Sequence, residues 1–402
     1  MVNVVAAGAA AKLGLRAASK MKYIAVTILG RDTEGILARA IDSVLRGGSR
    51  IADIQQSVVH GILSLFILTE GEGSAGPFRD RMISALSGFN LSVDVHETEE
   101  YVKDSFSEKF VITMIGKRSD EMLRVFAVTA ASLGINNIRI NMLSRGDLSA
   151  MQFVVDLDGC PPEKARKNIE SAMSGLEVDV IFEQESTFRM GKKLIVFDMD
   201  STLVSNETID ELAEIAGIGE DVSRITERAM NGEIDYIQSI RERVRLLKGI
   251  PASVLDEMKL SLTLNPGARD LISSLRSMKY RIALVSGGFT EFTDKMKEEL
   301  GLDYAFGNRL EVKNNHLTGN LEEPILDARG KQRIIEEIMM AEGISSKEVV
   351  VVGDGANDTV MVKNAGLGIA FRGKDVLRKV ADGTLSKSDL RSILYCLGHY
   401  GD

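Results

Sequence analysis

Apolar and polar positions in the N-terminal part of the chain follow one pattern twice. An early apolar run precedes a stretch in which Ile36, Ala40 and Val44 recur at helical spacing, and two more β-rich runs follow. This order predicts a β-α-β-β arrangement. The order returns from Lys109 and closes with a strand near residues 178–182. We interpret it as an internal repeat of about eighty residues, each copy a small βαββαβ α+β domain.

The C-terminal half has a different pattern, in which apolar runs alternate with helical stretches. The runs span residues 194–197, 282–285 and 349–352. Such alternation predicts an α/β fold with a doubly wound parallel sheet. About sixty residues between the first and second runs belong to no sheet strand, and their helical spacing predicts a helical cap at about 207–266.

These patterns divide the chain into parts. We expect residues 1–20 to form a disordered extension, residues 21–104 and 105–186 to form the two repeats, and residues 187–402 to form the α/β domain with its cap. The main boundary falls in the polar segment 186–193, just before a new apolar strand begins.

Composition and charge exclude several classes of protein. Acidic residues outnumber basic residues by 58 to 49 in the 402-residue chain, and the formal charge is −9. This charge repels a phosphate backbone and no basic patch reverses it, so we expect no nucleic-acid partner. No apolar stretch reaches the roughly 18 residues that a spanning helix needs, so we expect no membrane association. Cys160 and Cys396 fit neither a disulfide framework nor a zinc spacing, which favours the reducing cytoplasm.

Each apolar run of the C-terminal half ends in a polar or glycine-rich cluster. DMDST follows the first run, SGG the second and GDGAND the third. Ligands of open parallel sheets bind at the carboxyl ends of the strands, so the three clusters should converge. They bring together four carboxylates, those of Asp198, Asp200, Asp354 and Asp358. Carboxylates packed so closely need a cation, and oxygen ligands without histidine or thiol indicate Mg²⁺.

The same crevice has the features of an anion pocket. Lys331 opens a predicted helix, and Ser286 with Gly287 offers a hydroxyl and free N–H groups at a strand-to-helix turn. Both features suit a phosphate group. A cation site beside an anion pocket and a spare carboxylate indicates phosphoryl transfer.

The four clusters resemble the motifs of the haloacid dehalogenase superfamily, in order and at similar intervals. DMDST, SGG, Lys331 and GDGAND carry this resemblance, which extends from about residue 193 to the C-terminus. Within the superfamily, FDMDSTLVSNETIDELA, RVRLLKG, LVSGGFTEF and GDGANDTVM closely resemble the phosphoserine phosphatase family. Any one of these motifs would be weak evidence, but their combination is highly specific.

The resemblance implies a role for each polar residue of the crevice. Asp198 would attack phosphorus, and Asp200 would protonate the departing oxygen and then activate water. Asp198, Asp354 and the backbone carbonyl of Asp200 would hold Mg²⁺, and Ser286 and Lys331 would stabilise the transition state. Further roles concern Asn357, which would touch the substrate phosphate, and Asp358, which would orient Lys331 or a metal-bound water. Asn357 and Asp358 could instead close the loop as Asx turns.

Two charged residues of the cap suggest how an amino acid would be recognised. Arg243 interrupts an apolar helical stripe, and the family has an arginine there that would clamp a substrate carboxylate. The alternative is a surface arginine that extends its head group to water. Glu207 would pair with a substrate ammonium, or it could simply be an acidic residue that stabilises a helix N-terminus.

Each N-terminal repeat resembles an ACT domain, an amino-acid-sensing module that pairs edge to edge through its sheet. The sharpest match is DTEGI, where Asp32 and Gly35 mark a strand-to-helix turn that would bind an amino-acid effector. The second repeat has KRSDEML there and lacks the glycine, which puts ligand binding by that copy in doubt. A homodimer follows from the resemblance, and a scaffold without a ligand is an equal alternative.

The resemblance implies Mg²⁺-dependent hydrolysis of O-phospho-L-serine to L-serine and phosphate, the last step of serine biosynthesis. One alternative is a phosphatase or phosphotransferase that acts on another small phosphorylated metabolite. Another is a non-catalytic amino-acid sensor whose C-terminal half only binds its ligand.

Overall fold

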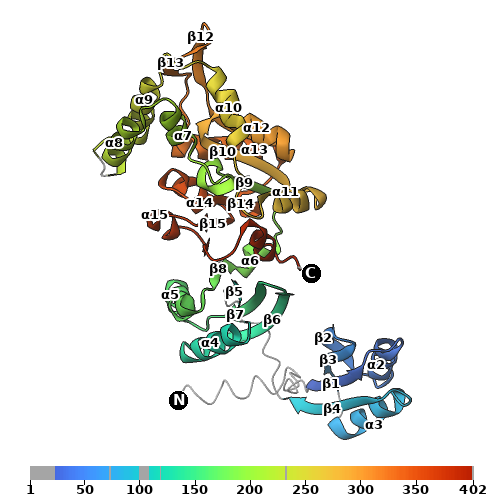
Figure 1. Ribbon diagram of the computed structural model, residues 1–402. Helices are drawn as coiled ribbons and strands as arrows, with labels where there is room; N and C mark the ends of the chain where they lie inside the picture. Colours follow the sequence, from blue (N-terminus) through green and yellow to red (C-terminus); the bar gives the residue numbers. More distant parts are fainter. Residues whose placement is uncertain (1–22, 72–73, 99–107, 118, 231–232, 401–402) are drawn as a thin grey trace, which may run out of the picture. The chain divides into compact units, whose positions relative to one another are not determined.

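The computed structural model of the protein describes residues 23–71, 74–98, 108–117, 119–230 and 233–400. The chain divides into two compact units, Met1–Phe106 and Ser107–Asp402 (Figure 1). The extension expected at residues 1–20 lies outside the described residues.

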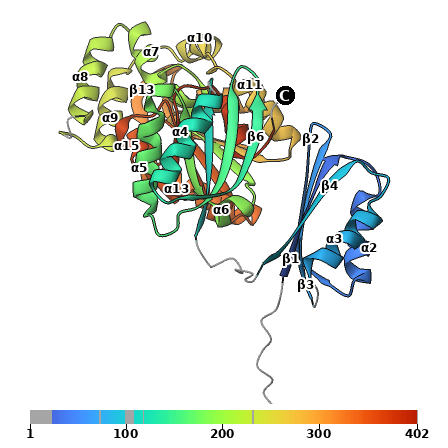
Figure 2. The same cartoon turned by 90° about the horizontal axis from the view of Figure 1, so that it is seen from below.

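The first unit contains the first repeat and is an antiparallel sheet with two helices. Its strands have the order β2-β3-β1-β4, and both helices lie on one side of the sheet (Figure 2). The residues predicted at helical spacing, Ile36, Ala40 and Val44, form the buried face of α2. The elements are β1 (Tyr23–Arg31), α2 (Ile36–Arg46), β2 (Arg50–Val59), β3 (Ile62–Glu70), α3 (Ala75–Ala85) and β4 (Leu91–Thr98).

The second repeat has the same order of elements and opens the second unit. Its strands are arranged β6-β7-β5-β8, which is the order of the first repeat, so the predicted βαββαβ fold is confirmed for both copies. The elements are β5 (Lys109–Gly116), α4 (Ser119–Ser132), β6 (Asn136–Arg145), β7 (Ser149–Asp156), α5 (Pro162–Met173) and β8 (Asp179–Gln184).

The α/β part of the second unit is built on parallel strands in the order β11-β10-β9-β14-β15-β16. Side chains of β9 alternate between two buried clusters: Ile195 and Phe197 pack with residues of α11 and α12, and Leu194 and Val196 with residues of α13 and α14. Helices therefore cover both faces, as predicted. The strands are β9 (Leu194–Phe197), β10 (Arg281–Phe289), β11 (Tyr304–Asn308), β14 (Val349–Gly353), β15 (Leu367–Phe371) and β16 (Gly383–Leu385). The helices are α11 (Ala268–Ser277), α12 (Thr290–Leu300), α13 (Ala328–Glu342), α14 (Thr359–Asn364), α15 (Asp375–Arg378) and α16 (Ile393–Cys396).

One sheet joins the second repeat to the α/β part. Strand β16 pairs antiparallel with β8 at Gly383 and Ile181. The described strands of the second repeat and of the α/β part therefore form one 10-stranded sheet that runs from β11 to β6 (Figure 1). The segment 186–193, where we expect the main boundary, begins within helix α6 (Glu185–Arg189) and leads into β9. Within α6, the side chains of Glu185 and Thr187 are buried.

The segment between β9 and β10 forms helices that stand beyond the end of the sheet (Figure 1). These are α7 (Thr208–Ile215), α8 (Gly219–Met230), α9 (Tyr236–Leu246) and α10 (Ser253–Ser261). A separate hairpin, β12 (Leu310–Lys313) with β13 (His316–Leu321), contacts α9. No helix in the described ranges is both long and apolar enough to cross a bilayer.

Candidate active site

The first polar cluster forms an irregular turn directly after β9. Asp198 is almost fully buried, and its Oδ1 accepts a hydrogen bond of 2.8 Å from the N–H of Met199. The next residues leave helical geometry, because Asp200 is extended and Ser201 is left-handed with φ 55°. Asp198 and Asp200 therefore do not lie on a regular helix, and their side chains have different neighbours.

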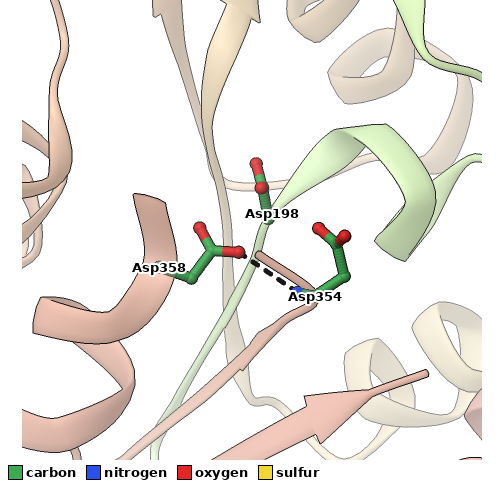
Figure 3. Close-up of side chains that lie close together, drawn as sticks. All are labelled: Asp198, Asp354 and Asp358. Atoms are coloured by element: carbon green, nitrogen blue, oxygen red, sulfur yellow. Dashed lines mark hydrogen bonds between the residues drawn. The ribbon is translucent and has the colours of Figure 1, made fainter. Parts of the chain in front are cut away.

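Three carboxylates from two strand ends meet beside this turn. The carboxylates of Asp198, Asp354 and Asp358 each bring one oxygen to within 4.8 Å of the others (Figure 3). Lys331 is fully buried from α13, and its Nζ lies 2.9 Å from Asp198 Oδ1 and 2.7 Å from Asp358 Oδ1. The predicted convergence of the distant clusters is thus present in the structure.

Asp358 has both of its oxygens engaged by the chain. Oδ1 accepts from Lys331, and Oδ2 accepts from the N–H groups of Asp354 and Gly355 at 3.1 Å each. Figure 3 shows the bond from Asp354. A side chain at the neighbouring Gly353 would clash with this arrangement, because a Cβ there would lie 2.5 Å from Asp358 Oδ2. Asp358 therefore fixes both the lysine and the loop after β14.

The electrostatics of the cluster show an excess of negative charge. Burial, and then the charge of Asp198, raise the pKa of Asp354 to about 6 and that of Asp358 to about 7. Burial alone would lower the pKa of Lys331, but the two carboxylates outweigh it and raise that pKa. Buried oxygen donors with uncompensated negative charge have the chemistry that a divalent cation such as Mg²⁺ requires, so the residues fit such an ion.

Asp200 is held from the cap side of the crevice. Its carboxylate accepts from the N–H of Thr208 at 3.3 Å and from the Thr208 hydroxyl at 3.1 Å, in the first turn of α7. Burial, with the negative charges of Asp198 and Glu207, raises the pKa of Asp200 well above its ordinary value. A carboxyl group in this setting favours its protonated form and is suited to donate a proton. Thr208 lies within the quoted stretch FDMDSTLVSNETIDELA, but sequence reasoning assigned it no role.

The SGG cluster forms the wall beside Asp200. Ser286 is buried and its Oγ accepts from the N–H of Gly288 at 2.9 Å. A Cβ on Gly288 would lie 3.0 Å from Asp200 Oδ2, so glycine keeps this space free. Asn357 reaches the same crevice, and its Nδ2 lies 3.4 Å from Asp198 Oδ2.

A cavity of about 710 Å³ opens over these groups, between the cap and the strand ends. Most of the residues expected at the site line it, namely Asp198, Asp200, Glu207, Arg243, Ser286, Gly287, Asp354 and Asn357. Lys331 and Asp358 are fully buried and are not among the lining residues. Lys331 contacts the lining residue Asp198.

The two charged cap residues differ in how they are satisfied. Arg243 has a buried Nε that finds no hydrogen-bond partner within the described residues. Its helix neighbour Arg241 instead pairs with Glu323. Glu207 Oε1 accepts from the Ser201 hydroxyl at 2.7 Å. The cavity thus contains an arginine with unused donor capacity and a carboxylate that lies at the first turn of α7.

The residues expected to bind an effector lie in the first unit. Gly35 is left-handed, with φ 91°, and immediately precedes α2. The N–H of Asp32 donates to the carbonyl of Gly61 at 2.9 Å. These residues form a turn of their own and are not part of the carboxylate cluster.

Two known families match separate parts of the chain. Residues 192–366 match the haloacid dehalogenase-like hydrolases, and residues 22–86 match the ACT domain.

Relatives are similar over most of the chain. A phosphoserine phosphatase of Streptomyces coelicolor is 33% identical over 383 residues, which covers 94% of this chain and 93% of the relative. One of Archaeoglobus fulgidus is 52% identical over 244 residues, 61% of this chain and 71% of the relative.

Solved structures agree with these relatives. A HAD-family hydrolase of Salmonella enterica serovar Typhi has a TM-score of 0.65 and 26% identity, and the match covers 72% of this chain and 98% of that one. A probable phosphoserine phosphatase of Vibrio cholerae has a TM-score of 0.59 and 30% identity over 72% of this chain and 86% of that one.

Proposed function

The chain belongs to the phosphoserine phosphatase family and is therefore a phosphatase, and from this premise we propose that it hydrolyses O-phospho-L-serine to L-serine and phosphate through an aspartyl phosphate. The observation that carries the proposal is one cavity that contains the buried Asp198, the neighbouring Asp200 and the Nε of Arg243, which has no hydrogen-bond partner in the part of the chain that the structure describes. In this proposal the enzyme catalyses the last step of serine biosynthesis.

The reaction takes place in two steps at Asp198. In the first, a carboxylate oxygen of Asp198 attacks phosphorus, the bond to the serine oxygen breaks, and Asp200 gives its proton to that oxygen. In the second, Asp200 takes a proton from water while the water oxygen attacks phosphorus, and the bond to Asp198 breaks to release phosphate. The raised pKa of Asp200 favours the protonated form that the first step needs.

Mg²⁺ would be held by Asp198, Asp354 and the backbone carbonyl of Asp200. When bound, the ion would offset the charge of the carboxylates and of the phosphoryl group. We assign Asp358 to positioning, because its oxygens already accept from Lys331 and from two backbone N–H groups.

The substrate would lie across the cavity with its charges matched. Arg243 would bind the carboxylate of phosphoserine and Glu207 the ammonium group, while Ser286, Gly287 and Asn357 would contact the phosphate. This arrangement uses the buried Nε of Arg243, which has no partner within the described residues.

Asp198→Asn tests the nucleophile. We expect an intact fold and a loss of turnover on the order of 10⁴-fold or more, because the amide cannot form the phosphoryl intermediate. Phosphate release from phosphoserine, with Mg²⁺ and with chelator, is the measurement. Activity of the variant above a trace would contradict the assignment.

Arg243→Ala tests the substrate handle. We expect kcat/KM for phosphoserine to fall by roughly 10²-fold and that for p-nitrophenyl phosphate to change little, since the aryl ester has no carboxylate to bind. Arg241→Ala is the matched control, because Arg241 lies on the same helix and pairs with Glu323 outside the cavity. Equal losses on both substrates would rule out the carboxylate clamp.

A panel of phosphorylated metabolites addresses the remaining alternative, a phosphatase or phosphotransferase with another substrate. Comparing the panel at fixed Mg²⁺, with and without an alcohol acceptor, separates the two. A purely binding role for the C-terminal half is not proposed further, because the chain is a phosphatase.

For the first unit we propose a regulatory role. The match to the ACT domain and the left-handed Gly35 before α2 support an amino-acid effector that binds near Asp32 and Gly35. We also propose a homodimer and a cytoplasmic location, the latter because Cys160 and Cys396 are both free. Calorimetry with serine and other amino acids, and sedimentation of the full chain, test these proposals; no heat with any amino acid would remove the effector.

A further inference from the structure

Asn265 lies where the chain returns from the cap to the sheet, between α10 and α11, and is only 3% exposed. Its Nδ2 donates to three carbonyls of the turn after β9: those of Ser201 at 3.2 Å, Thr202 at 2.8 Å and Val204 at 3.1 Å. Its backbone N–H donates to the carbonyl of Leu203 at 2.9 Å. One residue thus contacts four consecutive carbonyls of the turn that begins at the nucleophile.

This turn needs donors from outside itself. The left-handed Ser201 and the extended Asp200 interrupt regular helical pairing, and a buried carbonyl without a donor is costly. The amide of Asn265 supplies the missing N–H groups. The orientation of this amide is fixed by its surroundings, because carbonyls face Nδ2 and Arg372 Nη1 lies 3.4 Å from Oδ1.

Asn265 also stands at the base of the two segments that join the cap to the sheet. The N–H of Ser205 donates to the carbonyl of Thr263 at 2.8 Å, and the N–H of Thr263 donates to Asn206 Oδ1 at 2.7 Å. The outgoing and returning segments therefore run as a pair. The turn that bears Asp200 is held by Thr208 on the cap side and by Asn265 on the return side.

We propose that Asn265 is a positioning residue for the phosphatase reaction, which holds the turn from residue 199 to 204 so that Asp198 and Asp200 keep their relative places. It does not line the cavity, so it acts through the turn and makes no contact with the substrate. The inference rests on the proposed chemistry of Asp198 and Asp200 and does not depend on which phosphate ester is the substrate.

A graded series at this position tests the inference. Asn265→Thr keeps one donor, Asn265→Ala keeps none, and Asn265→Asp places an acceptor against the carbonyls. We expect kcat to fall in that order, by a few fold for threonine and by roughly 10²-fold or more for alanine and aspartate, with KM within about twofold of the wild type. Phosphoserine and p-nitrophenyl phosphate should show the same series.

A control separates positioning from loss of stability. Leu271→Ala removes a fully buried side chain of α11 in the same hydrophobic cluster and leaves the hydrogen bonds between Asn265 and the turn in place. We expect it to lower the melting temperature while kcat stays near the wild-type value. If Asn265→Ala and Leu271→Ala lose kcat in proportion to their melting temperatures, or if KM rises and kcat does not fall, the inference is wrong.

A second readout does not use activity. Amide hydrogen exchange of a peptide covering residues 198–206 should be faster in full-length Asn265→Ala and Asn265→Thr than in the wild type, and unchanged in Leu271→Ala. Unchanged exchange in the Asn265 variants would overturn the inference. If the wild type hydrolyses only p-nitrophenyl phosphate, the substrate assignment is wrong. The kcat values of the Asn265 variants on that ester then still test the positioning role.

Discussion

Glu183 and Lys192 form a buried ion pair at the base of the α/β part. Lys192 Nζ lies 2.6 Å from Glu183 Oε1, and the side chains are 4% and 5% exposed. Burial raises the pKa of Glu183 to about 7, and the attraction of Lys192 only partly opposes this effect. Even with its partner in contact, the carboxylate is therefore more costly to ionise in the folded chain than in water.

This pKa predicts how stability depends on pH. The folded chain binds the Glu183 proton more tightly than the unfolded chain, in which this carboxyl has its ordinary pKa of 4.5. The stability that the protonated carboxyl contributes is therefore full below pH 4.5 and is lost as the pH rises through about 7. Glu183→Gln does not titrate. We expect the free energy of unfolding of the wild type to fall relative to Glu183→Gln by about 3 kcal/mol across this range.

Urea unfolding of both proteins at several pH values gives the measurement, and the difference between them cancels the other titrating groups. If the free energy of unfolding of the wild type rises with pH relative to that of Glu183→Gln, the charged pair stabilises the fold and the prediction is wrong.

At the scale of elements, the cap and the sheet meet at Tyr236 and Gly287. The Tyr236 hydroxyl on α9 donates to the carbonyl of Gly287 on β10 at 3.2 Å, and Asn308 Nδ2 donates to the same carbonyl at 2.8 Å. Burial raises the pKa of Tyr236 to about 12, so the hydroxyl remains a donor at neutral pH. A Cβ on Gly287 would lie 2.3 Å from the hydroxyl oxygen.

Gly287→Ala should therefore push the cap away from the sheet. We expect kcat/KM to fall by roughly 10²-fold, because small displacements of a catalytic arrangement cost that much. Tyr236→Phe alone loses one hydrogen bond and should cost only a few fold. The double variant, in which the hydroxyl is gone, should recover part of the loss. If the double variant is as poor as the product of the two losses, the contact does not couple the cap to the sheet.

A second contact between elements joins β8 to the segment that follows β16. The carboxylate of Asp179 accepts from the N–H groups of Ser386, Lys387 and Ser388 at 2.8 to 3.1 Å, and the two serine hydroxyls add bonds at 3.3 and 2.8 Å. Asp179 is only 3% exposed, so its carboxylate takes the place of the water that these donors would otherwise bind.

Asp179→Asn should destabilise the chain by about 3 kcal/mol, because an amide nitrogen would face buried donors. Thermal and urea unfolding measure the loss. Glu170→Gln, at the partly exposed pair with Arg166, is the control and should change stability by less than about 0.5 kcal/mol. If Asp179→Asn is as stable as Glu170→Gln, the contact between Asp179 and residues 386–388 contributes little to stability.

The sequence predicted the strand ends well, and for a clear reason. Asp198, Ser286 and Asp354 each follow a continuous apolar run, and the geometry of a parallel sheet brings such positions together. The donors that hold those residues could not be predicted. Asn265 is 64 positions from Ser201, and Asp179 is 209 from Ser388. Neither residue stands in a motif, because such contacts depend on how separate elements pack.

At the scale of the whole molecule, the two repeats have different structural roles. The first belongs to a compact unit, Met1–Phe106, with a core of its own. The second lies in the unit Ser107–Asp402 and shares its sheet with the α/β part. Two repeats with the same strand order are therefore integrated into the chain to different degrees.

Two truncations test this difference. A chain starting at residue 107 should fold and keep kcat within about twofold, since every residue of the cavity and both sides of the β8–β16 pair are present. A chain starting at residue 190 should be unstable, because it loses Asp179 and uncovers the edge of β16. Circular dichroism and phosphate release measure both. A stable, active protein from the shorter chain would contradict the prediction.

The β8–β16 pair also limits which parts of the chain can be exchanged during evolution. A module with its own core, such as the first unit, can be exchanged for another module without breaking the sheet of the α/β part. A module whose last strand completes the neighbouring sheet must be inherited together with that sheet. We therefore expect recombination between related genes to exchange segments near residue 106 and to leave the strand pair at Ile181 and Gly383 intact.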